Sequence, residues 1–267
     1  MNLLLIAVIL GVVEGITEFL PISSTGHLII VGHYLEFTGD LATTFEISIQ
    51  LGSILAVVFY FREKILFLLK NAKTDESARN FLLAIAAAFM PAAVIGLLVH
   101  SWIEEYLFNP ITVACALILG GVLIIIIEKK AYDPKITKLE KVGIKNGFLV
   151  GCAQCCALFP GMSRSASTIM GGLLLKMDRI TAAEFSFFLA IPTMFAATGY
   201  DLVKNRDVLD GDGLQIILIG LVIAFFSSLL VINFLFAFIK KYNFQPFAYY
   251  RIILGVLILT FWGDIVV

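Results

Sequence analysis

Long apolar runs recur along the whole chain and constrain its fold more than any other feature. A helix needs about 20 apolar residues to cross the hydrocarbon core of a bilayer. Hydrophobic residues make up 60% of the 267 residues and charged residues only 15%. Runs of spanning length predict six transmembrane helices, at about 43–61, 81–99, 111–127, 184–200, 214–239 and 247–266. The sequence therefore predicts an all-α, polytopic membrane protein.

The basic residues are distributed unevenly among the segments that link these runs. Segments 62–80 and 128–145 are rich in Lys and Arg, whereas 100–110 contains neither. Cytoplasmic loops of membrane proteins carry an excess of Lys and Arg. We therefore place 62–80 and 128–145 in the cytoplasm, and 100–110 outside together with 201–213.

Two further apolar stretches are each broken by a proline. Residues 3–33 are interrupted at Pro21 and residues 144–175 at Pro160. The arm after each break reaches about 18 Å as a helix, against a hydrocarbon core of about 30 Å. We predict that both stretches are re-entrant helix hairpins, which a membrane tolerates where the broken backbone is buried in protein or lines a polar cavity.

A short internal repeat connects the two hairpins. A shift of 139 residues aligns Pro21–Ser24 with Pro160–Ser163, and a shift of 138 aligns residues 46–48 with 184–186. Each match is short, but the order of one hairpin followed by three spans also recurs. We therefore predict homologous halves.

The predicted protein is a single integral-membrane domain with halves at about 1–135 and 136–267. Because three spans per half is an odd number, the second half must be inverted relative to the first. The two hairpins then enter from opposite faces and their tips meet near the middle of the bilayer. Inverted repeats with broken helices commonly place a site at that depth.

Two carboxylates lie in the first arm of the first hairpin. Glu14 and Glu18 are separated by four residues, so both project from one face of a helix. An ionised carboxylate at membrane depth costs about 2.5–3.5 kcal/mol on insertion scales. A polar turn follows directly after Pro21, and we interpret the carboxylates and this turn as part of an active site.

The tip of the second hairpin contributes a cation. Arg164 lies between Ser163 and Ser165, and its planar guanidinium matches the geometry of phosphate. Helices that begin just after each break would add backbone N–H donors at the same point. This inventory predicts hydrolysis of a phosphate ester or anhydride. We predict that Arg251, the other arginine at depth, is a snorkelling or structural residue.

The spacing of the polar residues suggests their roles. Ser24 and His27 are three residues apart on a short helix, which predicts a nucleophile and its base. Glu14 and Glu18 either bind a divalent cation, Mg²⁺ or Ca²⁺, or act as acid and base, one of them orienting His27. Arg164 is predicted to hold the phosphoryl group with donors from both turns: Ser23, Thr25, Gly26, Ser163 and Ser165.

Residues 14–27 (EGITEFLPISSTGH) and 160–168 (PGMSRSAST) resemble the two signature segments of the bacitracin-resistance family of bacterial undecaprenyl-diphosphate phosphatases. The resemblance covers essentially the whole chain. It implies a hydrolase of the bacterial cytoplasmic membrane that converts undecaprenyl diphosphate to the monophosphate, recycles the lipid carrier for cell-wall synthesis and confers bacitracin resistance. It also implies a site open to the outer face, with functional residues at Glu14, Glu18, Ser24, His27 and Arg164.

A second function remains compatible with an inverted repeat and a polar site at depth, namely a lipid flippase or secondary transporter. The pairing of Ser24 and His27 beside Arg164 favours hydrolysis, because a carrier needs no nucleophile. We expect polyprenyl diphosphate and membrane lipids as partners, and no nucleic acid. Glycine pairs at 120–121 and 171–172 permit close helix packing, which a homodimer would use.

Overall fold

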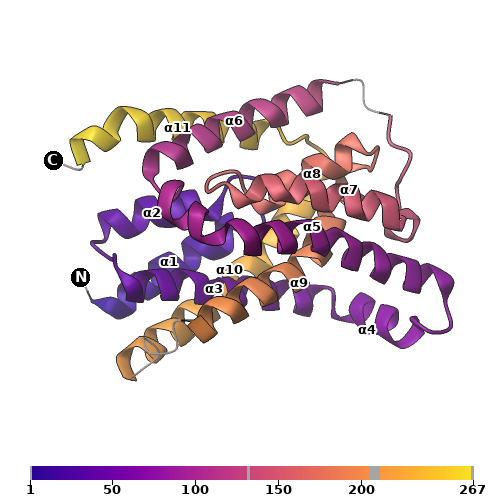
Figure 1. The fold of residues 1–267 in the computed structure, drawn as a ribbon, viewed down its shortest axis with the longest axis horizontal. Helices are drawn as coiled ribbons and strands as arrows, with labels where there is room; N and C mark the ends of the chain where they lie inside the picture. Colours follow the sequence, from indigo (N-terminus) through magenta and orange to yellow (C-terminus); the bar gives the residue numbers. More distant parts are fainter. Residues whose placement is uncertain (1, 131–132, 205–210, 266–267) are drawn as a thin grey trace.

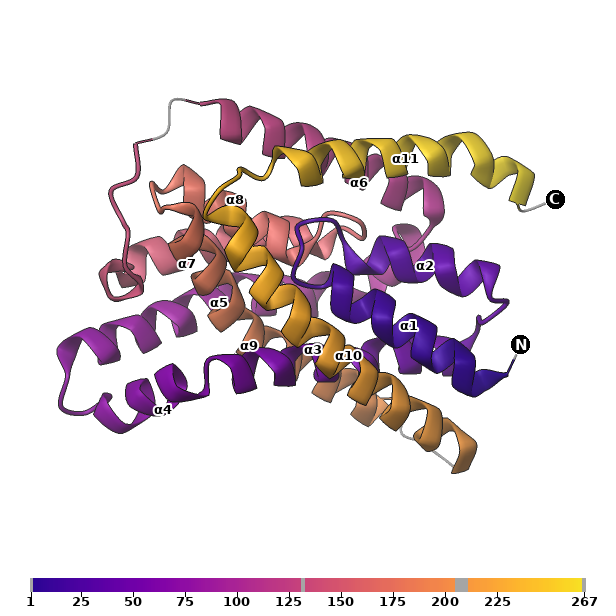
Figure 2. The same ribbon diagram turned by 180° about the vertical axis from the view of Figure 1, so that it is seen from behind.

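Helices account for all the regular structure in the described residues, 2–130, 133–204 and 211–265, apart from an isolated bridge between Ile136 and Met177. Figures 1 and 2 show the computed structural model from opposite sides. The α-helices are α1 (Leu3–Thr17), α2 (Ser24–Tyr34), α3 (Asp40–Tyr60), α4 (Arg62–Asn71), α5 (Glu76–Tyr106), α6 (Pro110–Lys129), α7 (Ile144–Gln154), α8 (Arg164–Leu174), α9 (Arg179–Lys204), α10 (Gly211–Ile239) and α11 (Gln245–Ile265). Two short 3₁₀ helices lie at Leu139–Lys141 and Cys155–Leu158.

Five helices in the described part of the chain are long and apolar enough to cross a membrane, namely α3, α5, α6, α9 and α10. They confirm five of the six predicted spans and an all-α, polytopic membrane protein. The sixth corresponds to α11, whose apolar stretch Gln245–Phe261 belongs with the shorter apolar helices. Within the predicted outer segment 201–213, residues 205–210 lie outside the described residues.

The helices α1 and α2 form one hairpin and α7 and α8 form another. The two hairpins extend from opposite ends of the molecule and meet in its middle (Figures 1 and 2). At their meeting point the Ser165 hydroxyl donates to the Leu20 carbonyl, 3.0 Å away. The predicted meeting of the two tips is therefore present.

The two turns share an unusual backbone geometry. Ser23 and Ser163 are the N-caps of α2 and α8, with φ angles of 73° and 71°. Each hydroxyl accepts from the amide three residues further on, that of Gly26 at 3.4 Å and that of Ala166 at 3.2 Å. A serine cap satisfies a backbone N–H that lacks a helical partner. Because positive φ is uncommon outside glycine, the match between the two turns is specific.

This geometry aligns Ser23 with Ser163, a shift of 140 residues instead of the predicted 139. The cap lies two residues after Pro21 but three residues after Pro160. The additional residue is accommodated at Gly161, whose φ is 93°, a conformation open to glycine at little cost. An alignment based on the prolines is thus one residue out of register. That the halves are inverted repeats stays a prediction.

Arg251 on α11 holds the two turns together. Its side chain is fully buried, so the predicted snorkelling is wrong and the structural role is the correct alternative. A Cβ atom on Gly120 of α6 would lie 2.1 Å from its Nη2 atom, so this glycine makes room for the guanidinium. The guanidinium donates to five backbone carbonyls at 3.0–3.3 Å, those of Ala116, Leu117, Pro21, Gly161 and Met162.

Both predicted glycine pairs pack within the chain. Gly121 lies against Ile252 of α11, and Gly171 lies against Ala153 of α7. Close packing at these positions is therefore used inside the protomer and gives no separate argument for a homodimer. The oligomeric state stays a prediction.

Candidate active site

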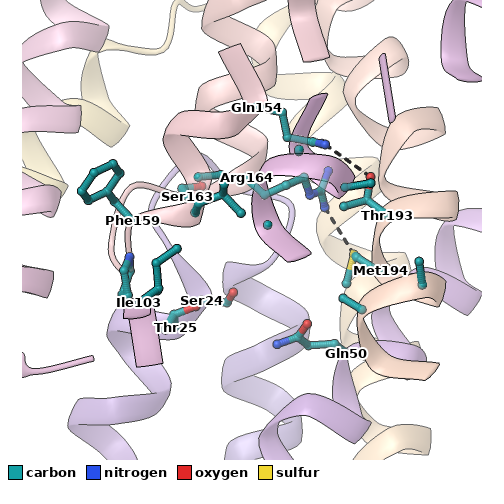
Figure 3. Close-up of a pocket in the computed structure, with 18 of the residues that line it drawn as sticks. Ser24, Thr25, Gln50, Ile103, Gln154, Phe159, Ser163, Arg164, Thr193 and Met194 are labelled. Atoms are coloured by element: carbon teal, nitrogen blue, oxygen red, sulfur yellow. Dashed lines mark hydrogen bonds between the residues drawn. The ribbon is translucent and has the colours of Figure 1, made fainter. Parts of the chain in front are cut away.

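A cavity of about 460 Å³ lies beside the two turns (Figure 3). Side chains of α5 and α9 supply much of its apolar wall, among them Phe89, Leu97 and Met194. The polar side chains that line it include Glu18, Ser23, Ser24, Thr25, Gln50, Gln154, Ser163, Arg164 and Thr193. Residues from the two halves of the chain therefore share one chamber.

Glu18 connects the two turns. Its Oε1 atom accepts from Nη2 of Arg164 at 3.0 Å, and its Oε2 atom accepts from the Ser24 hydroxyl at 2.6 Å. The side chains of Arg164 and Glu18 are only 12% and 9% exposed, so water screens this ion pair little. The structure thus brings together three of the predicted site residues, a hydroxyl, a carboxylate and a guanidinium.

Contacts with α9 fix the position of the Arg164 side chain. Its Nη1 atom donates to the Ser186 carbonyl at 3.1 Å and lies 3.4 Å from the Ser186 hydroxyl. That hydroxyl is 2.6 Å from the hydroxyl of Thr168, which donates to the Arg164 carbonyl one turn back along α8. Sequence reasoning assigned no role to Ser186 or Thr168. The spacing of four residues between Arg164 and Thr168, which places both on one face of a helix, is the sequence feature that could have indicated this contact.

His27 lies outside the cavity lining and does not form the predicted pair with Ser24. Its Nδ1 atom lies 2.7 Å from the Ser23 carbonyl and therefore carries the proton, because a carbonyl can only accept. Its Nε2 atom then accepts from the hydroxyl of Tyr250, also at 2.7 Å, and the two rings are stacked. The bond to the carbonyl four residues back turns the imidazole toward α11, while Ser24 turns toward Glu18.

Glu14 is fully buried behind the cavity. Its Oε1 atom accepts from the Ser53 hydroxyl at 3.3 Å, which in turn accepts from Ser228 at 3.0 Å. Its Oε2 atom has no hydrogen-bond partner among the described residues. Glu18 faces the cavity and has both oxygens engaged, so the two carboxylates have different surroundings.

The described residues contain no group of three or more His, Cys, Asp and Glu side chains placed to hold a metal. Glu14 offers one unpartnered carboxylate oxygen, and a bound diphosphate would bring further oxygen ligands. Divalent-cation binding by Glu14 and Glu18 stays a prediction.

Two predicted phosphate ligands serve the turns themselves. Ser165 is fully buried and its hydroxyl joins the two tips, while the Gly26 amide donates to the Ser23 cap. The helices α2 and α8 do begin at Ser24 and Arg164, as the sequence predicts. Their first-turn N–H groups therefore add positive potential at the cavity.

The fold and the site together define a class, a polytopic membrane protein in which two helix turns bring a serine hydroxyl, a carboxylate and an arginine together beside one cavity. Residues 7–257 match the family described as bacitracin resistance protein BacA, and the chain belongs to this family.

Relatives from several bacteria support the assignment along nearly the full length. The chain is 53% identical over 262 residues to the undecaprenyl-diphosphatase of Caldanaerobacter subterraneus subsp. tengcongensis, covering 97% of this chain and 96% of the relative. Identity to the undecaprenyl-diphosphatase of Acinetobacter baumannii is 48% over 254 residues, which cover 95% of this chain and 93% of the relative. Identity to the undecaprenyl-diphosphatase of Aromatoleum aromaticum is 47% over 260 residues, which cover 97% of this chain and 95% of the relative.

Proposed function

We propose that this protein hydrolyses undecaprenyl diphosphate to undecaprenyl phosphate and inorganic phosphate, and so recycles the lipid carrier used in cell-wall synthesis. The observation that carries the proposal is the contact chain from Ser24 through Glu18 to Arg164. It combines a nucleophile, a proton acceptor and an anion-binding group beside a cavity. The full-length similarity to undecaprenyl-diphosphatases supports the same substrate.

In the first step the Ser24 oxygen attacks the terminal phosphorus. Its proton passes to Glu18, whose Oε2 atom already accepts the hydrogen bond from this hydroxyl. The bond between phosphorus and the bridging oxygen breaks, and the lipid monophosphate leaves with the electron pair and takes the proton from Glu18. Arg164 and the N–H groups of the two helix N-termini stabilise the charge on the transferred phosphoryl group.

In the second step water attacks the phosphorus of the phosphoserine. The new bond joins the water oxygen to phosphorus, and the bond from phosphorus to the Ser24 oxygen breaks. One water proton passes to Glu18, which returns it to Ser24. Inorganic phosphate leaves, and both side chains return to their starting states.

We place the mouth of the cavity on the outer face of the membrane. Ile103 and Phe108, near the junction of α5 and α6, line it together with Asp201 near the end of α9. These positions belong to the predicted outer segments, whereas α4 and the C-terminal end of α6 lie at the opposite end of the molecule (Figure 1). A lipid diphosphate in the outer leaflet would reach the cavity from this side.

The test uses purified protein in proteoliposomes that contain the polyprenyl diphosphate. We expect release of inorganic phosphate, and loss of that release in Arg164→Ala. Movement of the lipid between leaflets without phosphate release would contradict the proposal and favour a flippase.

The same assay tests the divalent cation. Chelation followed by back-titration with Mg²⁺ or Ca²⁺ should abolish and restore phosphate release if Glu14 and Glu18 bind a cation. Activity that persists in chelator assigns both glutamates to metal-independent roles.

A further inference from the structure

Gln154, the last residue of α7, lines the cavity, and the oxygen of its side chain is buried without a hydrogen-bond partner among the described residues. The residue is only 2% exposed, and its Nε2 atom donates to the Thr193 hydroxyl at 3.4 Å. That hydroxyl gives its own proton to the Leu189 carbonyl at 2.8 Å, so it can only accept from Gln154. The amide orientation is thereby fixed, and Oε1 has no hydrogen-bond partner among the described residues. A buried acceptor without a partner requires an explanation.

Arg164 carries a matching unsatisfied donor in the same cavity. Its two Nη atoms contact Glu18 and Ser186, but its Nε–H group has no partner within the described part of the chain. A phosphoryl oxygen would accept from this N–H group. The oxygen of Gln154 cannot bind a deprotonated phosphate oxygen, because both are acceptors, and it therefore requires an O–H group such as that of water.

The placement of these side chains fits an in-line displacement. Figure 3 shows Ser24 and Gln154 on opposite sides of the Arg164 guanidinium. The group that leaves when Ser24 attacks departs from the side opposite the serine oxygen, and the hydrolytic water must enter there. Other phosphoryl-transfer enzymes use a glutamine to orient the attacking water.

We propose that Gln154 is a positioning residue that orients the water for hydrolysis of the phosphoserine. The inference rests on the phosphatase function proposed above. The water oxygen forms the new bond to phosphorus as the bond to the Ser24 oxygen breaks. One water proton travels through Glu18 to Ser24, and the other O–H group donates its hydrogen bond to Oε1 of Gln154.

The geometry of the other hairpin supports this assignment independently. The shift of 140 residues that aligns the two turns also aligns Glu14 with Gln154 and Ser53 with Thr193. Glu14 contacts Ser53 at 3.3 Å and Gln154 contacts Thr193 at 3.4 Å, and each keeps one unpartnered oxygen. On the Gln154 side the side chain is a neutral amide, which repels a nearby phosphate less than a carboxylate would.

The experiment compares Gln154→Met, Gln154→Glu and the control Gln215→Met, whose position on α10 is exposed. For Gln154→Met we expect kcat for phosphate release to fall by about 10- to 100-fold, with KM changed less than about threefold, because the water is no longer oriented. Phosphate covalently bound to the protein after acid quenching should increase. Gln154→Glu restores the oxygen and should recover part of kcat, but its charge should raise KM. Gln215→Met should match the wild type.

Two results would overturn the inference. One is an unchanged kcat in Gln154→Met. The other is an equal loss of kcat in Gln154→Met and Gln154→Glu, accompanied by a loss of thermal stability and by no increase in phosphate covalently bound to the protein. That result would indicate a packing role for Gln154. Failure of the proposed function itself is a separate result, since the wild type would then release no phosphate.

Discussion

Glu18 is the residue that connects Ser24 with Arg164. It accepts from the serine hydroxyl and pairs with Arg164, whereas His27 is occupied by the Ser23 carbonyl and by Tyr250. The sequence predicted the identity of these residues but not their partners. Spacing along a helix says which side chains share a face, but the choice between a nearby carboxylate and a nearby imidazole depends on contacts across the fold.

We predict that Glu18→Gln lowers kcat by about 10²- to 10⁴-fold, the usual contribution of a general base. The amide keeps the shape of the side chain but cannot take the proton of Ser24. The matched control is Glu105→Gln at an exposed position of α5. Wild-type rates in Glu18→Gln would remove Glu18 from this role.

His27→Gln provides the complementary prediction. We expect a lower rate, because the turn that carries Ser23 loses a hydrogen bond, but the shape of the pH–rate profile should match that of the wild type. Tyr250→Phe removes one hydrogen bond to the imidazole and should reduce the rate less than about tenfold. If an acid limb of the wild-type profile disappears in His27→Gln, the imidazole is the base after all.

At the scale of the elements, both hairpins and their helix starts follow from the sequence. The breaks at Pro21 and Pro160 are visible in the sequence, and arms as short as those that follow them cannot span a bilayer. The register of the repeat and the role of Arg251 could not be predicted from the sequence. The register depends on the backbone geometry of Ser23 and Ser163, and the role of Arg251 depends on backbone carbonyls of α6 and of the two turns. The residue pattern of a sequence does not show where backbone atoms lie.

Gly120→Ala tests this arrangement of the turns. The added methyl would overlap the Arg251 guanidinium and displace it from its carbonyl partners. We expect a loss of about 2–3 kcal/mol of stability, typical of overpacking in a core, together with lower activity. Thermal unfolding in detergent measures the first effect. Gly199→Ala on α9, where an added Cβ meets nothing within 4 Å, should behave as the wild type. Equal stability of both variants would argue against the role of Arg251.

At the scale of the whole molecule, the α5–α6 junction, which contributes Ile103 and Phe108 to the cavity lining, and the basic helix α4 lie toward opposite ends (Figure 1). Five of the six predicted spans are confirmed, because a membrane-spanning helix needs a long apolar run, which the sequence shows directly. The helix α11 runs from Gln245 to Ile265 and lies alongside α6, and its apolar stretch Gln245–Phe261 corresponds to the sixth predicted span.

Cysteine labelling in intact cells tests the predicted orientation. The four native cysteines are free and can be replaced by alanine before a single cysteine is introduced. A membrane-impermeant thiol reagent should label Glu105→Cys directly. It should label Lys73→Cys, an exposed position after α4, only after permeabilisation. The opposite pattern would place the cavity mouth on the cytoplasmic side.

The most direct test of the central claim is the initial rate of phosphate release from polyprenyl diphosphate by Ser24→Ala. The account predicts a fall of at least about 10³-fold, because loss of a nucleophile removes the covalent route. Thr260→Ala removes a hydroxyl at an exposed position of α11 and should retain the wild-type rate. A Ser24→Ala rate close to that of the wild type would contradict the account.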